Sequence, residues 1–173
     1  VDGVFDDCQT MVKNAFMDAE LNQHMKLTSA NSINVARFLP QSFYYFWAYA
    51  QLKKQGIAVN GAPSAVAPKL VACVPSGNFG NICSALFGRR MGLPIDRFIA
   101  ANNANDIFYN YLQTGRYNPR PSTATIANAM DVGDPSNFAR ILDLYGHSHE
   151  AITEQISGAT YTDEQIASTM RQC

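Results

Sequence analysis

The first third of the chain is dominated by apolar residues at helical spacing. Apolar positions from Phe5 to Met25 recur every three or four residues, which predicts a helix. Leu27–Asn34 predicts a short strand that ends in a cluster of Ser and Asn. The longer segment Ile33–Gln55 predicts a second helix, which Pro40 should kink or split. Within it, Phe43–Tyr49 is apolar on every side, a pattern typical of a helix that is covered by other parts of a protein.

In the middle of the chain, patterns typical of strands alternate with patterns typical of helices. The uninterrupted apolar run Lys69–Val74 predicts a strand buried on both faces, and Ile82–Met91 predicts the helix that follows it. A second strand at Arg97–Ala101 precedes a helix that runs through Leu112. This order of elements predicts an α/β fold, with an open, mainly parallel sheet and flanking helices.

The last third of the chain is irregular at first and then helical. The segment 116–134 is rich in Pro, Ser, Thr and Asn and is expected to form a loop. Residues 137–144 and 150–156 are expected to be helices. Thr162 begins a capping pattern that predicts a final helix reaching the end of the chain.

Composition and charge argue against several classes of binding partner for this chain. The chain has 173 residues, the size of one typical domain. Thirteen Lys and Arg residues and fourteen Asp and Glu residues give a net charge of −1, which argues against nucleic acid or an anionic membrane as the main partner. The longest unbroken apolar run, Phe43–Ala50, is far shorter than the ~20 residues of a membrane-spanning helix. Four cysteines without C-x-x-C spacing indicate a reducing compartment, the cytoplasm, and Cys73 and Cys83 are expected to be buried.

The strongest local motif is the glycine-bearing segment Ser76–Asn81, which lies between a predicted strand and a predicted helix. Gly77 and Gly80 allow a tight turn that directs successive N–H groups toward the helix N-terminus, and Asn78 and Asn81 add amide donors. The motif lacks the Lys-Ser/Thr of a Walker A loop and the third glycine of a dinucleotide fingerprint. The pattern favours a mononucleotide-sized or cofactor monophosphate, and the alternative is a glycine-rich turn without a ligand.

Two further polar clusters offer ligand sites, and each has a structural alternative, which spacing alone favours for the first cluster and leaves about even for the second. Asn34 and Arg37 share a helix face, and with the preceding Asn31 and Ser32 they form a donor-rich pocket for a second anion. The alternative is a helix N-cap, at Asn31 or Ser32, beside a surface arginine. Asn102–Asp106 follows the carboxyl end of a strand, where open α/β sheets bind ligands, although Asn is also frequent in turns.

The remaining polar side chains point to no catalytic group and no metal site. His147 and His149 lack the carboxylate or Cys neighbours that would complete a metal-ligand set, and a solvated loop is the expected setting. The five lysines lie in amphipathic or strand-flanking positions, none of which would lower an amine pKa for Schiff-base chemistry: Lys13, Lys26, Lys53, Lys54 and Lys69.

Several blocks of sequence, in one order and over nearly the whole chain, resemble the bacterial and fungal threonine synthase family. The blocks are Phe5–Gln9 with Val12–Lys13, Ser29–Asn34, Val74–Asn81, Asp96–Ala101, Asn128–Gly133 and Ser136–Phe138. The resemblance implies the fold of tryptophan synthase β chain and threonine dehydratase. It also implies dependence on pyridoxal 5′-phosphate and the conversion of O-phosphohomoserine and water to L-threonine and phosphate.

The resemblance also implies roles for two groups of residues. The cofactor phosphate would be held by Gly77, Asn78, Phe79, Gly80 and Asn81. The substrate site would be bordered by Asn31, Ser32, Asn34 and Arg37. The motif with the family's Schiff-base lysine is absent, as is the C-terminal region whose hydroxyl residue faces the pyridine nitrogen. The chain is therefore expected to be a central piece of the enzyme, inactive without the remainder of the polypeptide.

In the fold of this family, residues 1–27 would be the end of a small mobile domain and residues 28–173 part of the large cofactor-binding domain. The aromatic helix Phe43–Tyr49 would then be partly exposed here, or buried by self-association. Two alternative functions stay open on the sequence alone. One is another pyridoxal-phosphate lyase of this fold, such as a dehydratase, and the other is a non-catalytic phosphate-binding α/β module.

Overall fold

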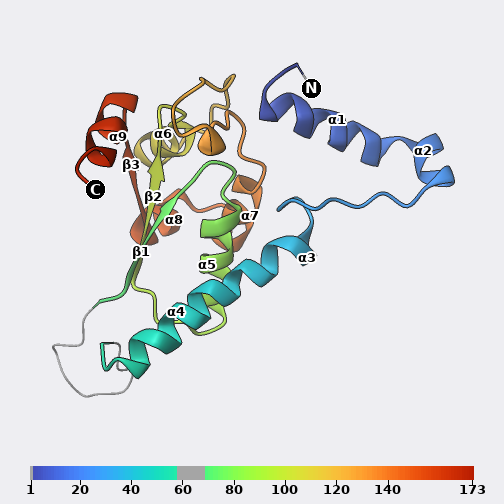
Figure 1. The fold of residues 1–173 in the computed structure, drawn as a ribbon. Helices are drawn as coiled ribbons and strands as arrows, with labels where there is room; N and C mark the ends of the chain where they lie inside the picture. Colours follow the sequence, from blue (N-terminus) through green and yellow to red (C-terminus); the bar gives the residue numbers. More distant parts are fainter. Residues whose placement is uncertain (1, 58–68) are drawn as a thin grey trace.

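A parallel sheet forms the centre of the computed structural model, which describes residues 2–57 and 69–173. In the described part of the chain the sheet has three strands in the order β1 (Val71–Pro75), β2 (Arg97–Asn102) and β3 (Ile156–Thr160) (Figure 1). Val74 pairs with Ala100, and Phe98 pairs with Ile156. The predicted α/β class with a parallel sheet and flanking helices is confirmed.

Helices fill the connections between the parallel strands. The helix α5 (Gly80–Arg90) joins β1 to β2. The longer connection from β2 to β3 contains α6 (Ile107–Thr114), the 3₁₀ turn η2 (Asn128–Met130), α7 (Phe138–Leu144) and α8 (His149–Gln155). Buried side chains of these helices pack with those of β2 into one apolar core, which includes Phe98, Ile82, Phe108, Ile141 and Ile152.

The amino-terminal residues form an arm that projects from this body (Figure 1). The predicted single helix is two helices, α1 (Phe5–Met17) and α2 (Ala19–His24), because Asp18 leaves the helical conformation and caps α2. The Asp18 carboxylate accepts a hydrogen bond from Leu21 N at 2.9 Å. A side-chain contact with the body runs from Gly133 N to Asp6 Oδ2, at 3.0 Å.

The long apolar segment after the arm is divided at Pro40, as its sequence predicts. A short helix α3 (Val35–Phe38) is followed by the 3₁₀ turn η1 (Leu39–Gln41) and then by α4 (Ser42–Lys54). Pro40 lies in the first turn of the new helical segment, where its missing N–H costs no hydrogen bond.

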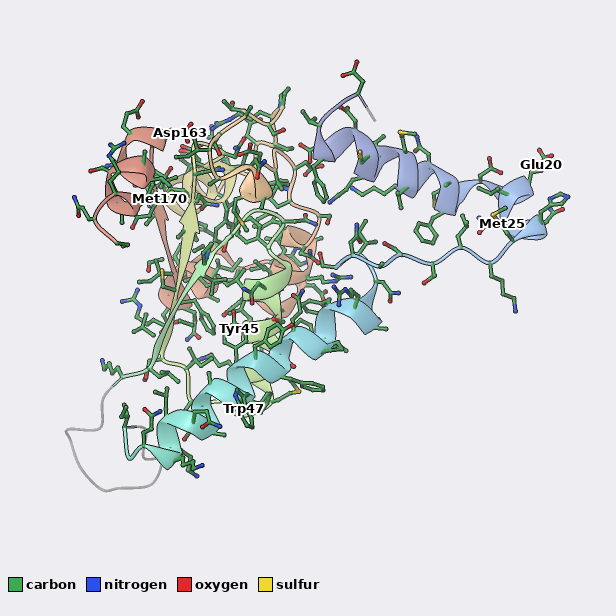
Figure 2. All side chains as sticks on the ribbon, viewed as in Figure 1. Glu20, Met25, Tyr45, Trp47, Asp163 and Met170 are labelled. Carbon is green, nitrogen blue, oxygen red and sulfur yellow. The ribbon has the colours of Figure 1, made fainter. Side chains whose placement is uncertain are left out.

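The aromatic helix α4 has one covered side and one exposed side, so the expected partial exposure is confirmed. Tyr45, Phe46 and Tyr49 pack against the core. Phe43, Tyr44 and Trp47 are 67, 71 and 69% exposed. Figure 2 labels Tyr45 and Trp47 on this helix.

The carboxyl-terminal helix begins where its sequence predicts. The helix α9 (Asp163–Met170) has a capping box, in which Thr162 Oγ1 accepts from Gln165 N and Gln165 Oε1 accepts from Thr162 N. Asp163 and Met170 mark its two ends in Figure 2.

Several sequence-based expectations about the strands are wrong. Leu27–Asn34 is irregular rather than a strand. β1 is an edge strand of the described sheet and is not buried on both faces, since Val71 is 47% exposed. Cys73, in the same strand, is exposed, and of the two cysteines expected inside only Cys83 is buried. The strand β3 was not predicted: the helix expected at 150–156 ends at Gln155, and Ile156 begins β3.

Two further sequence-based expectations concern membrane-spanning helices and the segment 60–68. No helix among residues 2–57 and 69–173 has the length and apolar character to cross a bilayer. The segment 60–68, whose Gly, Pro, Ser and Ala residues predict a loop, lies outside the described residues.

Candidate functional site

The glycine-bearing loop lies between β1 and α5, at the carboxyl end of the parallel sheet. Two hydrogen bonds fix its first residue to β2: Ser76 N donates to Ala101 O at 2.8 Å, and Asn102 Nδ2 donates to Ser76 O at 2.7 Å. Phe79, the residue before α5, has a left-handed backbone with φ of 62°. A bulky side chain rarely adopts this conformation, which here turns the chain sharply into the helix.

The turn leaves a series of backbone donors without protein acceptors. Across the described residues, the N–H groups from Gly77 to Ile82 have no hydrogen-bond acceptor, and the first bonded amide of α5 is Cys83 N, which donates to Phe79 O. These donors gather where the helix dipole adds partial positive charge. Such an arrangement can accept an anion such as a phosphate monoester, and it is formed by the residues that the sequence singles out.

Aromatic packing holds Phe79 in its unfavourable backbone conformation. Such a conformation costs about 1–3 kcal/mol and persists only where surrounding structure enforces it. The Phe79 ring is 3% exposed and lies 4.7 Å, centroid to centroid, from Phe108 of α6. Phe108 in turn contacts Phe138 of α7 at 5.7 Å, and Phe138 stacks on Tyr117 at 4.2 Å. Burial in this aromatic cluster stabilises the turn that exposes the N–H groups.

Two glycines of the loop are required because the backbone of Met130 and the side chain of Ser32 approach closely. A Cβ on Gly77 would lie 2.8 Å from the Cα of Met130 in η2. A Cβ on Gly80 would lie 2.8 Å from the Cβ of Ser32 and 3.0 Å from its Oγ. The segments around Met130 and Ser32 therefore form two walls of the loop, and neither leaves room for a side chain at these positions.

The two asparagines of the loop use their oxygens for structure. Asn78 Oδ1 accepts from Ser136 N at 2.7 Å and from Ser136 Oγ at 2.9 Å. Asn81 Oδ1 accepts from Tyr45 Oη at 2.7 Å, and burial raises the pKa of this tyrosine to about 12, so it stays a donor even in mildly alkaline solution. Neither amide nitrogen has an acceptor among the residues described, so both remain available as the predicted amide donors.

The second polar cluster is mostly committed to local structure. Asn34, rather than Asn31 or Ser32, is the N-cap of α3: its Oδ1 accepts from Ala36 N at 3.0 Å, and its Nδ2 donates to Ser29 O. Asn31 Oδ1 accepts from Ile33 N at 2.9 Å in the preceding turn. Arg37 is exposed, and its Nε donates to Ala30 O at 2.9 Å. Of the four predicted residues, Ser32 is the one that the structure brings against the glycine loop.

The asparagine run after β2 serves as a framework. Asn103 and Asn105 are buried, and their side-chain amides both donate to Asp131 Oδ1, at 2.7 and 3.0 Å. Thr125 adds two more hydrogen bonds to the Asp131 carboxylate. These contacts fold the 116–134 segment back toward the sheet and place η2 beside Gly77. The turn interpretation of this run therefore fits better than the ligand interpretation.

Two residues that sequence reasoning missed connect the walls of the loop. Asn137, which is fully buried, donates from Nδ2 to Ser32 Oγ and to Asn78 O, both at 2.8 Å. Arg140 donates to Ser32 O at 2.5 Å and to Ile33 O at 2.8 Å. The spacing of Asn137 and Arg140 by one helical turn was the available signal, because it places both side chains on one face of a helix.

The histidines take no part in this site. His149 Nε2 lies 3.0 Å from Tyr111 O and 3.1 Å from Leu112 O, at the carboxyl end of α6, where it is half-buried instead of lying in a solvated loop. His24 Nδ1 lies 2.9 Å from Glu20 O at the end of α2. Over the described ranges, no cluster of His, Cys, Asp and Glu is arranged to hold a metal ion.

Comparison with known proteins finds relatives along almost the entire chain. No protein-family model matches it. It is 43% identical to the threonine synthase of Serratia marcescens and 42% identical to that of Escherichia coli, in both cases over 99% of this chain and 38% of the relative. The crystal structure of the Escherichia coli threonine synthase superposes with a TM-score of 0.85, again over 99% of this chain and 38% of that one.

A further solved relative is a threonine synthase from Brucella melitensis with bound PLP, at 33% identity and a TM-score of 0.78, over 99% of this chain and 40% of that one. The chain thus spans about two fifths of the length of the relatives that it matches. In sequence and in fold, it is a homologue of that portion of the threonine synthases.

Proposed function

We propose that the chain is the phosphate-binding portion of a threonine synthase, whose complete polypeptide converts O-phosphohomoserine and water to L-threonine and phosphate with pyridoxal 5′-phosphate. The observation that carries the proposal is the row of unpaired N–H groups from Gly77 to Ile82 at the start of α5. A dianionic monoester is the ligand class that such a row accepts best. The relatives' shared name and the PLP reported for the Brucella melitensis relative support the choice of this cofactor.

The residues present fit the cofactor's phosphate. In this proposal the backbone N–H groups of the loop, with the amides of Asn78 and Asn81, donate to its oxygens: Gly77, Asn78, Phe79, Gly80 and Asn81 form the set. A cofactor bound there supplies an electron-withdrawing pyridine ring, which stabilises negative charge that develops on an amino-acid substrate. The loop's own contribution is to anchor and orient this group through rigid donors.

The substrate site is proposed to lie beside the loop and next to the amino-terminal arm. Two clefts, of about 620 and 490 Å³, share Lys13 of α1 and Ile33 as lining residues and so lie between the arm and the body. Of the predicted substrate residues, Asn34 lines the first cleft, Asn31 and Ser32 directly precede the lining residue Ile33, and Arg37 follows one turn later in α3. The terminal nitrogens of Arg37 have no partner among the described residues and could hold a substrate anion.

The separation of the amino-terminal arm from the body supports the proposed domain boundary. Residues 1–27, which contain α1 and α2, would be the end of a small domain, and residues 28–173 part of the large domain. The arm contacts the body through the hydrogen bond that Gly133 N donates to Asp6 Oδ2. Ligand sites between domains are common, which agrees with the position of the two clefts.

The 173-residue chain is proposed to be inactive without the remainder of its polypeptide. Its five lysines, at positions 13, 26, 53, 54 and 69, are all exposed. An amine that forms a Schiff base is usually desolvated, so that its pKa falls. None of the five has that environment, and the reactive lysine would come from the part of the polypeptide outside this chain.

The exposed side of α4 is proposed to be covered in the complete protein. Phe43, Tyr44 and Trp47 expose an apolar face that the remainder of the polypeptide would bury, and a second copy would cover it in the isolated chain. Sedimentation of the isolated chain as a monomer would argue against self-association. The four free cysteines agree with a cytoplasmic location.

Activity of the complete polypeptide tests the proposal. Incubation with O-phosphohomoserine and the cofactor should release threonine and phosphate, whereas serine or threonine should be poor substrates. Preference for serine or threonine would identify a dehydratase, and no turnover of any of the three would favour a non-catalytic module. The coding sequence on both sides of the chain adds an independent check, because a lysine motif upstream is required. The isolated chain should not acquire the absorbance of a covalent lysine adduct with pyridoxal phosphate.

A further inference from the structure

Side chains at the start of α7 form hydrogen bonds to two loops that are distant in sequence. We call these residues, Ser136, Asn137 and Arg140, the polar clasp. Asn137 is fully buried, and its Nδ2 donates both to Ser32 Oγ and to Asn78 O, at 2.8 Å each. Its neighbour Ser136 donates from N and Oγ to Asn78 Oδ1. One turn of α7 therefore fixes Ser32 and the middle of the glycine loop at the same time.

Arg140 adds a rigid fork to this clasp. Its guanidinium donates to Ser32 O and Ile33 O, and also to Asn137 Oδ1. The same group lies 4.8 Å from the centroid of the Phe38 ring, which restricts its orientation. Because the five N–H donors of an arginine are coplanar, these contacts determine where the Ser32 backbone lies.

Within the described residues, the clasp leaves the hydrogen of the Ser32 hydroxyl free to be donated. Ser32 Oγ accepts from Asn137, and among the described residues its own hydrogen has no acceptor. The side chain lies against Gly80, where a Cβ would come within 3.0 Å of its Oγ. A hydroxyl in this position can donate to an anion at the head of α5, alongside the unpaired N–H groups.

We propose that Asn137 and Arg140 are positioning residues for the phosphate, which hold Ser32 so that its hydroxyl and the N–H groups of the glycine loop converge on one anion. The inference rests on the proposed function of the loop. Neither side chain needs to touch the phosphate, because each acts through Ser32, and Asn137 also acts through Asn78. The role therefore differs from general support of the core, which would affect binding of all ligands alike.

A pair of ligands that differ only in the phosphate tests this inference. Pyridoxamine 5′-phosphate and pyridoxamine cannot form a Schiff base with a lysine, so calorimetric titration of the complete, cofactor-free polypeptide measures reversible binding alone. Asn137→Ala should lower the preference for the phosphorylated ligand by about tenfold, since it releases the Ser32 hydroxyl, whose proposed hydrogen bond to the phosphate is charge-assisted. Arg140→Lys keeps the charge without the fork and should cause a smaller loss of the same preference.

A matched control separates positioning from folding. Arg90 also donates to a backbone carbonyl, Leu144 O at 2.8 Å, and Arg90→Met should leave the ligand preference unchanged. If Asn137→Ala does not fold, Ser32→Ala removes only the hydroxyl and should reproduce the loss. If Asn137 acts through Ser32, the double variant should lose less than the product of the two single losses.

The outcomes distinguish the two proposals. A wild-type protein that binds both ligands equally would refute the phosphate cradle itself, and the positioning role with it. A wild-type preference that persists in Asn137→Ala, Arg140→Lys and Ser32→Ala would overturn the positioning role alone. Equal weakening of both ligands in the variants would also overturn it, because this result indicates only a structural contribution.

Discussion

Gly80 and Gly88, two buried glycines of α5, make a matched pair for testing how tightly the Ser32 segment packs on the helix. A Cβ on Gly80 would lie 2.8 Å from the Cβ of Ser32, a position held by Asn137 and Arg140. A Cβ on Gly88 would lie 3.0 Å from Leu93 Cδ1, the terminal methyl of a flexible side chain, with its next neighbour at 3.7 Å. Substitution to Ala therefore meets a fixed obstacle in one case and a movable one in the other.

Gly80→Ala and Gly88→Ala should change the free energy of unfolding by different amounts. Alanine in a helix is favoured over glycine by about 0.5–1 kcal/mol. Overpacking against a fixed neighbour costs about 1–3 kcal/mol. Gly80→Ala should therefore destabilise the protein by about 1–2 kcal/mol, and Gly88→Ala should stay within about 1 kcal/mol of the wild type. For a chain of this size, each kcal/mol corresponds to a shift in Tm of roughly 2–4 °C.

Hydrogen exchange locates the effect as well as measuring it. In the complete polypeptide, Gly80→Ala should increase exchange in Ser29–Asn34, because the new methyl group displaces Ser32 from α5. Gly88→Ala should leave exchange in this segment at the wild-type rate. Equal unfolding free energies and equal exchange in the two variants would refute the close approach of Ser32 to Gly80.

Three other predictions need simpler assays. Burial raises the pKa of the Cys83 thiol to about 12, so this thiol is almost entirely protonated at pH 8. Iodoacetamide should therefore modify the exposed Cys73 in the native protein and leave Cys83 unmodified. Peptide mass mapping can verify this difference. Asp131→Ala leaves buried amide donors unpaired and should destabilise by about 3 kcal/mol or more in thermal unfolding, whereas Asp143→Ala, at an exposed position, should be neutral. Trp47, the single tryptophan, lies on the exposed side of α4 and should be shielded from acrylamide in the isolated chain at concentrations where a second copy covers that side; quenching as ready as that of the free amino acid at every concentration would argue against self-association.

Local sequence predicted those features whose cause is local. The apolar run before Ser76, the glycines after it and the helical spacing beyond them were enough to place β1, the turn and α5. The capping box at Thr162 and the division at Pro40 also depend on residues within one or two turns. In each case, the groups that satisfy the backbone lie close by in the chain.

Features that depend on distant partners could not be predicted in this way. Ile156–Thr160 contains small and polar residues, and it becomes β3 because Phe98–Asn102 offers a parallel strand to pair with. Leu27–Asn34 was predicted as a strand, but side chains such as Asn31 and Asn34 satisfy its backbone in turns and a helix cap. Similarly, the contacts of Asn137 and Arg140 with Ser32 bridge more than a hundred residues of chain.

The geometry of the proposed phosphate loop depends on the aromatic core as much as on its glycines. Glycine at positions 77 and 80 permits close approach, yet the residue with the left-handed backbone between them is Phe79. Its conformation is unfavourable in isolation and is retained because the ring packs on Phe108, which in turn contacts Phe138 beside Asn137. The same aromatic contacts therefore set the direction of the N–H groups and the position of the clasp that holds Ser32. A truncation of Phe108 should consequently weaken phosphate binding even though its ring lies in the core, because both walls of the site lose their common support.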